Sequence, residues 1–155
     1  MYNEFTHFAV EGSVDVASGY TTSRTVEWFS PYVGFFEVVP TGMTLTITDV
    51  LLNPEENVTA AHRVCLFDGF PNGGGEIFFE LRAQPLTTRQ AHLLTGYVIQ
   101  PGHKVISFTL ALPPANQSMV VWLTGYVPKP WAWWWSRARY TRKPRMIRPN
   151  VPAAA

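Results

Sequence analysis

The sequence predicts an all-β protein: an antiparallel β-sandwich, with a jelly-roll as the expected topology, followed by an extended C-terminal arm. Thirteen prolines and eleven glycines divide the 155 residues into short segments. These segments are rich in Val, Ile, Thr, Phe and Tyr, which is the composition of strands between turns. Helical periodicity is nowhere sustained, so a helical domain is not expected.

The expected organisation is one domain plus one arm. Residues 1–127 are assigned to the β-sandwich, and a chain of this length can bury enough surface to fold without disulfides. Within this domain, residues 1–30 are expected to form either edge strands or an N-terminal arm. Residues 128–155 are assigned to a C-terminal arm, because Pro128 and Pro130 break away from the last strand.

The clearest strand is expected at Met43–Leu52. Leu45, Ile47, Asp49 and Leu51 alternate there with Thr44, Thr46, Thr48 and Val50, which predicts one mainly aliphatic face and one mainly threonine face. Other segments with strand composition are bounded by turn residues. We expect these further strands at Phe5–Val16, Thr25–Trp28, Gly34–Val39, Arg63–Phe67, Glu76–Arg82, Gln90–Ile99, Lys104–Ala111 and Met119–Val127.

Two Pro-to-Gly turns and one short repeat organise these strands. Val39–Gly42 and Gln100–His103 place Pro before Gly, which suits a tight turn. The pentapeptide Leu-Thr-Gly-Tyr-Val occurs at Leu94–Val98 and again at Leu123–Val127. Two copies do not indicate a solenoid. We interpret both as strands in which Gly permits a bulge or a close neighbour; a shared ligand contact is the alternative.

The sequence contains no motif for catalysis, a metal or a cofactor. The four histidines lie far apart, and none has the spacing of a zinc site. The one cysteine, Cys65, lies in an apolar run and is expected to be a buried hydrophobic side chain. The chain is therefore predicted to be non-enzymatic and without cofactors. It shows no export signal, and no stretch has the length of a membrane span.

Charge and aromatic residues divide the chain into two unequal parts. The arm holds four of the six tryptophans and seven of the twelve Lys and Arg residues, with no Asp or Glu. The preceding 127 residues contain five basic and eleven acidic residues, a net charge of −6. A cationic, aromatic segment of this kind is expected to lie on a larger partner.

We expect the arm to bind the acidic body of a neighbouring subunit, with aromatic anchors and arginine partners. Three alternatives remain open: binding to nucleic acid, which is less favoured, adsorption to a membrane surface, and packing of the arm on its own domain. The residues assigned to the interface are Trp131, Trp133, Trp134, Trp135, Arg137, Arg139, Tyr140, Arg142 and Arg145.

The turn-and-strand runs Val39–Pro54, Gly96–Gly102 and Val121–Val127 resemble small jelly-roll β-sandwich proteins among the accessory structural proteins of tailed phages. The resemblance implies a virion component assembled in the host cytoplasm, such as a capsid decoration or cement protein. Its partners would be copies of itself and a major shell protein. The alternative function is a carbohydrate- or receptor-binding module, in which exposed Trp28, Tyr32 or Trp122 stack on sugar rings.

Overall fold

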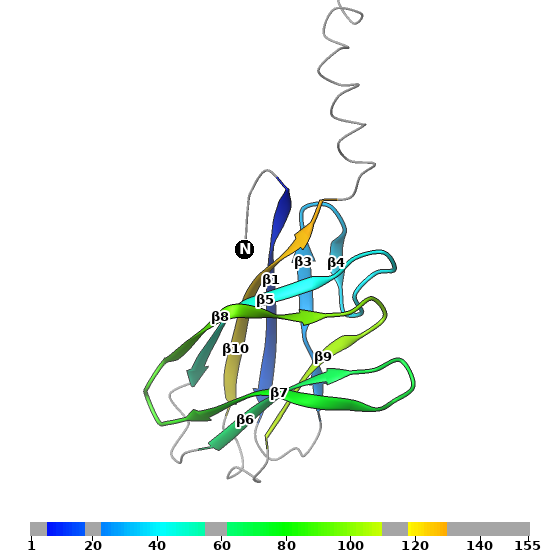
Figure 1. Ribbon diagram of the computed structural model, residues 1–155. Coiled ribbons are helices and arrows are strands. Elements are labelled where there is room, and N and C mark those ends of the chain that lie inside the picture. The colour runs from blue at the N-terminus through cyan, green and yellow to red at the C-terminus, as the bar shows by residue number, and fades with distance from the viewer. Residues whose placement is uncertain (1–5, 18–22, 55–61, 110–117, 130–155) are drawn as a thin grey trace, which may run out of the picture.

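The computed structural model describes residues 6–17, 23–54, 62–109 and 118–129, and all their regular elements are strands (Figure 1). The arm residues assigned to the interface, Trp131 to Arg145, lie outside these ranges. The strands are β1 (His7–Ala17), β2 (Arg24–Thr25), β3 (Glu27–Ser30), β4 (Gly34–Phe36), β5 (Leu45–Pro54), β6 (His62–Gly69), β7 (Gly75–Ala83), β8 (Arg89–Ile99), β9 (Lys104–Thr109) and β10 (Ser118–Pro128).

The strands form two antiparallel sheets, which confirms the predicted β-sandwich. The six-stranded sheet has the order β4-β3-β1-β10-β5-β8, and the four-stranded sheet has the order β2-β9-β6-β7. The first long strand pairs with the last, and the chain changes sheet after β1, β2, β5, β7, β8 and β9. Four strands of each sheet therefore have jelly-roll connectivity, and the β3–β4 hairpin extends one of them. Within residues 1–30, β1 lies between β3 and β10 and is neither an arm nor an edge strand, whereas the short β2 is an edge strand of the four-stranded sheet.

The predicted strand Thr25–Trp28 is two strands in different sheets. Thr25 pairs with Ile106 of β9, whereas Glu27 pairs with Ser13 of β1. Between them Val26 is fully buried, and its N–H donates to the carbonyl of Val105 over 2.9 Å. The chain crosses from one sheet to the other at this residue. Strand composition alone did not reveal the crossing.

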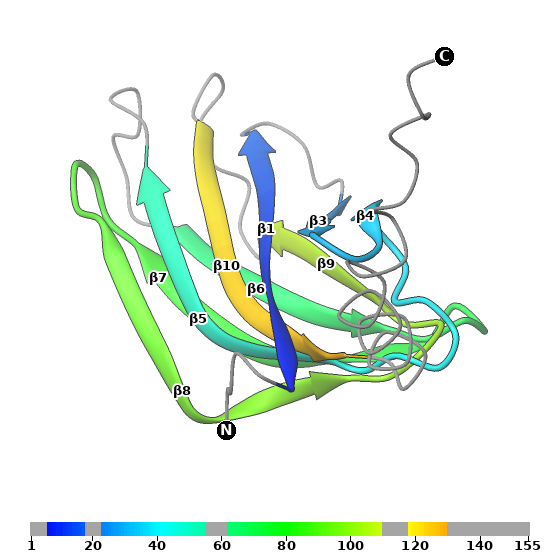
Figure 2. The ribbon, with the colours of Figure 1, turned by 90° about the horizontal axis from the view of Figure 1, so that it is seen from above.

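The predicted alternation of β5 fails at its midpoint. Leu45 and Ile47 are buried, but the next buried aliphatic residues are Val50 and Leu52. The pairing of β5 with both β8 and β10 skips Thr48, so this residue is a bulge. A bulge adds one residue to the strand and reverses the face of every residue after it. β5, β8 and β10 all bend along their length (Figure 2).

The two copies of the repeated pentapeptide lie on β8 and β10, the strands on either side of β5, next to the bulge. Gly125 of β10 lies against the backbone of Thr46 and Ile47, and Gly96 of β8 lies against the Thr46 side chain and the Ile47 carbonyl oxygen. A Cβ added at Gly125 would stand 2.1 Å from the carbonyl oxygen of Thr46, and Gly96 has a φ of +70°. Both positions therefore require glycine. This confirms the structural interpretation of the repeat.

Both Pro-Gly turns form as predicted, and they lie side by side. Met43 N–H donates to the carbonyl of Pro40, and His103 N–H donates to that of Gln100, both over 3.1 Å. The two turns are joined because Gly102 N–H donates to the carbonyl of Val39. Gly102 has a φ of +82°, the left-handed conformation that glycine accepts without strain.

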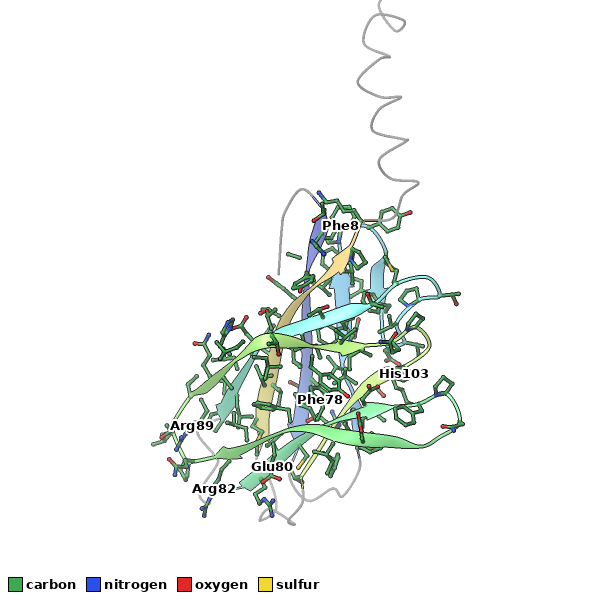
Figure 3. The ribbon with its side chains drawn as sticks, in the orientation of Figure 1. Phe8, Phe78, Glu80, Arg82, Arg89 and His103 are labelled. Carbon is green, nitrogen blue, oxygen red and sulfur yellow. The ribbon has the colours of Figure 1, made fainter. Side chains whose placement is uncertain are left out.

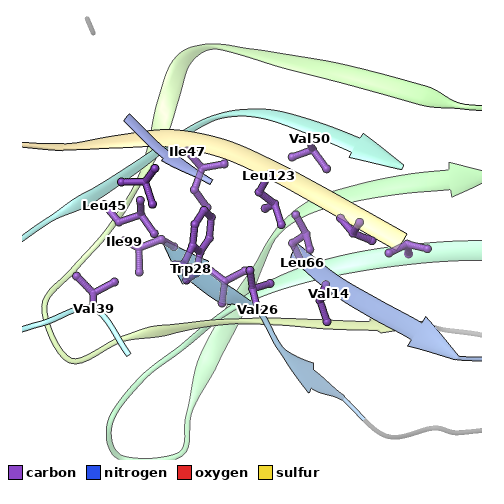
Figure 4. Packing of buried hydrophobic residues seen from close by; sticks show 14 of the residues in the cluster. Val14, Val26, Trp28, Val39, Leu45, Ile47, Val50, Leu66, Ile99 and Leu123 are labelled. Atoms are coloured by element: carbon purple, nitrogen blue, oxygen red, sulfur yellow. The ribbon is translucent and has the colours of Figure 1, made fainter. Parts of the chain in front are cut away.

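The core between the sheets is centred on Trp28, which Figure 4 shows among aliphatic side chains of both layers. Trp28 has no exposed surface, so the expectation that it is an exposed sugar-stacking residue is wrong. Its indole lies against Gly12 of β1, where an added Cβ would approach Trp28 Cε3 to 2.6 Å. Cys65 is also fully buried, as predicted, and burial raises the pKa of its thiol.

Candidate functional site: the outer face of the six-stranded sheet

The face of the six-stranded sheet that points away from the core, here called the outer face, carries two continuous rows of side chains. Directly paired residues on adjacent strands share a face, so the register defines each row. The first row, in order across all six strands, is Phe35, Phe29, Glu11, Thr124, Asp49 and His92. The second row is Glu27, Ser13, Trp122, Leu51 and Gln90.

Three of these residues, Phe29, Phe35 and Trp122, form an exposed aromatic patch. Their exposed fractions are 45%, 72% and 47%. The rings of Phe29 and Phe35 lie 5.1 Å apart between centroids. All three border a hollow of about 250 Å³ that is also lined by Glu11 and Glu27. A group of large aromatic rings in solvent is a common feature of binding surfaces.

The charges of the outer face have one sign. Glu11, Asp15, Glu27 and Asp49 point outward, and no Lys or Arg does so among the described residues of these strands. Glu11, Asp15 and Glu27 form no ion pair within the described part of the chain. Arg24 of the other sheet borders the hollow that Asp15 and Glu27 line. The face therefore offers negative charge beside the aromatic patch, with the positive charge of Arg24 at its margin.

Asp49 is the exception, because its carboxylate has several partners. His92 Nδ1 lies 2.8 Å from Asp49 Oδ1, and the hydroxyls of Thr48 and Thr124 donate to Oδ2 over 2.8 and 3.2 Å. Partial burial acts to raise the pKa of Asp49, but the hydrogen bonds from His92 and the two threonines outweigh it and leave the pKa below its usual value. The bulge at Thr48 brings these groups together.

Beside this cluster lies an open cleft of about 580 Å³ where β8 departs from β5. It is lined by Thr48, Tyr126 and the segment from His92 to Gly96. Four residues of β8, from Leu93 to Gly96, stand between the pairs that β8 makes with Asp49 and Ile47. Leu94 is 92% exposed at this irregularity. Leu94 thus adds an exposed aliphatic side chain to the three exposed aromatic rings of the sheet.

A different polar cluster joins the two sheets and lies away from the outer face. His103 Nδ1 is 2.8 Å from Asp68 Oδ1, and the Tyr97 hydroxyl donates to Glu76 over 2.9 Å. Tyr97 also stacks on Phe78 at 4.2 Å, and burial followed by these carboxylates raises its pKa. Figure 3 shows His103 near one end of the strands and Phe78 within the sandwich. Only Asp68 of this cluster is buried, and the hydrogen bonds link β8 of one sheet to β6 and β7 of the other.

The structure separates the residues that the sequence indicated for sugar stacking. Trp122 is half exposed on the outer face, and Tyr32 is 45% exposed and stacks on Phe8 with centroids 5.7 Å apart. The sequence interpretation missed Phe29 and Phe35. The alternation Val26-Glu27-Trp28-Phe29 contains the necessary pattern, because it places Trp28 inward with Val26 and Phe29 outward with Glu27.

The described residues contain no group of three His, Cys, Asp or Glu side chains arranged to hold a metal ion. Nor do they include a helix whose length and apolar character would let it cross a membrane.

Comparison with known proteins gives a likeness of fold alone. No family model matches the chain, and no curated protein matches it. Among solved structures, the crystal structure of murine APRIL at pH 8.5 is similar over 79% of this chain and 99% of that chain, with 15% sequence identity and a TM-score of 0.43. This similarity assigns neither a ligand nor a partner to the present protein.

Proposed function

We propose that this chain is a non-enzymatic structural subunit that assembles with neighbouring protein subunits. In line with the resemblance noted above, its setting is a virion, where it would act as a capsid decoration or cement protein. One observation carries the assembly proposal: the outer face combines an aromatic patch with outward carboxylates and, among its described residues, has no Lys or Arg. Such a face is suited to a partner that is both apolar and cationic.

Association through this face would remove its exposed aromatic rings from water. Large aromatic rings at the centre of an interface supply most of the binding free energy, and a half-exposed ring gains from further burial. Carboxylates around them contribute orientation and rate of association more than affinity. Phe29, Phe35 and Trp122 supply the first property, and Glu11 and Glu27 supply the second.

Sedimentation velocity of the full chain, over a range of protein concentrations at low and high salt, tests this proposal. We expect a defined oligomer at low salt that weakens at high salt, because exposed charges are screened. A monomer at every concentration and at both salt levels would contradict self-assembly.

A carbohydrate-binding module is the second candidate, supported by the half-exposed rings of Trp122 and Tyr32. A glycan array probed with the full chain and with Trp122→Ser separates the two functions. Glycan binding that the substitution removes, from a protein that sediments as a monomer, would favour the carbohydrate module over the structural subunit.

A further inference from the structure

We propose that the outer face of one subunit receives the C-terminal arm of a second copy of the chain. The arm would lie across the strands, with its tryptophans on the aromatic patch and its first arginines over the carboxylates. This inference rests on the proposed function and deepens it, because it names the receiving surface and the occupant. The arm residues that would contact the face are Trp131, Trp133, Trp135, Arg137 and Arg139.

Charge complementarity favours this occupant. The arm carries seven Lys and Arg residues and no Asp or Glu. The outer face presents four carboxylates and, among the described residues of its strands, no outward Lys or Arg. Glu11 and Glu27 form no ion pair within the described chain, so a cationic partner need not displace an existing one. Association of these two surfaces neutralises charge that each otherwise leaves in solvent.

The order of residues along the two surfaces also matches. The first row of the outer face runs from aromatic residues, Phe35 and Phe29, to the carboxylates of Glu11 and Asp49. The arm runs from tryptophans to arginines, and alternate residues of an extended segment share one side. A row across six strands spans roughly 24 Å and nine extended residues span roughly 26 Å, from the usual strand spacing and rise. The lengths therefore agree as well.

The geometry at the start of the arm points to a second copy rather than the same subunit. Lys129 N–H donates to the carbonyl of Thr6 over 2.8 Å, so the chain still follows the direction of β10 after the strand ends. Lys129 Nζ lies 5.0 Å from the centroid of the Phe8 ring, and Figure 3 shows Phe8 at this end of the sandwich. Pro130 further favours an extended backbone at Lys129.

Distance keeps the backbone of the first anchor, Trp131, away from the row of its own subunit. Thr124 marks the first row on β10, five residues before Lys129, which is roughly 17 Å of strand. Trp131 follows Lys129 by two residues and reaches at most about 7 Å from it, in any direction. The backbone of Trp131 therefore stays roughly 10 Å from its own row. The same segment can lie on the row of a neighbour without reversing its direction.

Photo-crosslinking of the full chain tests the contact directly. Benzoylphenylalanine replaces Phe35, which is 72% exposed, so the fold should tolerate it. Equal amounts of ¹⁴N- and ¹⁵N-labelled protein are mixed, irradiated, digested and analysed by mass spectrometry. We expect cross-links from position 35 to peptides containing Trp131–Arg137, including light–heavy pairs. The same probe at Ile77, which is 49% exposed on the other sheet, should give no arm cross-links.

The outcomes are distinguishable. Cross-links to the arm without light–heavy pairs would show that the arm packs on its own subunit and would overturn the inference. Cross-links only to other segments would overturn it too, while an oligomer seen by sedimentation would leave the proposed function intact. A monomer at every concentration, with no intermolecular cross-links, would contradict both this inference and the proposed self-assembly.

Charge exchange between two variants gives an independent test. Glu11→Lys with Glu27→Lys reverses two charges of the face, and Arg137→Glu with Arg139→Glu reverses the two charges of the arm that would lie over them. Each double variant alone should self-associate at least about tenfold more weakly than the natural chain, because like charges meet. Mixing them should restore association, since the charges of arm and face at these positions are then opposite in every pairing of unlike variants. Failure of the mixture to associate, with both variants folded by circular dichroism, would contradict the inference.

Discussion

Trp28 and Trp122 show how one residue type serves two purposes in a single sheet. Trp28 on β3 has no exposed surface and lies at the centre of the core. Trp122 on β10 is 47% exposed and belongs to the aromatic patch on the opposite face. The inner face is closed by the second sheet, whereas the outer face has no covering element in the described chain. Stability should therefore depend on Trp28 and association on Trp122.

The largest expected effect comes from removing the core tryptophan. Trp28→Ala should lower the free energy of unfolding by about 3–5 kcal/mol, because it leaves a cavity between the sheets. Urea denaturation followed by far-UV circular dichroism measures the loss. A change of less than about 1 kcal/mol would mean that Trp28 is not the centre of the core.

Gly12→Ala tests the same packing from the opposite side. The added methyl group would lie 2.6 Å from Trp28 Cε3, so the indole or β1 must move. We expect a loss of about 1–3 kcal/mol in the free energy of unfolding, typical of an overpacked core. Gly74→Ala is the matched control, since its new Cβ would approach no atom closer than 3.4 Å. Equal effects of the two substitutions would contradict the close packing.

Asp49→Asn tests the polar cluster at the bulge. Because hydrogen bonds hold the pKa of Asp49 below its usual value, its carboxylate stabilises the fold above about pH 4, and this contribution falls as pH drops through the folded-state pKa. We expect a loss of about 1 kcal/mol at neutral pH that shrinks in acid. Chemical denaturation at several pH values measures it, with Asp15→Asn as the control. A loss that stays constant from neutral to acid pH would contradict this assignment.

The smallest effect on stability is expected at the outer tryptophan. Trp122→Ser should change the free energy of unfolding by less than about 1 kcal/mol, since half of the ring is already in solvent. Its effect should appear in association instead. Thermal unfolding at a concentration where the natural chain is monomeric separates the two. A loss as large as that of Trp28→Ala would show that the outer face is part of the stabilising core.

Local patterns in the sequence were sufficient to predict the fold class, most strands and both Pro-Gly turns. They failed where the register changes. The bulge at Thr48 turns Val50 inward and Leu51 outward, and the crossing at Val26 divides one expected strand between two sheets. Both depend on which strands become neighbours, and the spacing of residues along one segment does not contain that information.

The candidate site was less predictable than the fold. Phe29 and Phe35 lie next to each other only because β3 pairs with β4. Trp122 lies near them because a single strand, β1, separates β10 from β3. Trp28 was assigned to the surface because its residue type suits sugar binding, although alternation with Glu27 placed it inward. The arm residues, from Trp131 to Arg145, lie outside the described ranges, and their role stays a prediction.

The most direct test of the central claim is sedimentation equilibrium of the full chain with the patch altered. Phe35→Ser combined with Trp122→Ser removes two exposed rings from the outer face, and Ile77→Ser combined with Leu86→Ser removes two exposed apolar side chains elsewhere. We predict that the first pair weakens self-association at least about tenfold while the control pair leaves it unchanged. Equal association of both variants and the natural chain would contradict the claim that the outer face binds a neighbouring subunit.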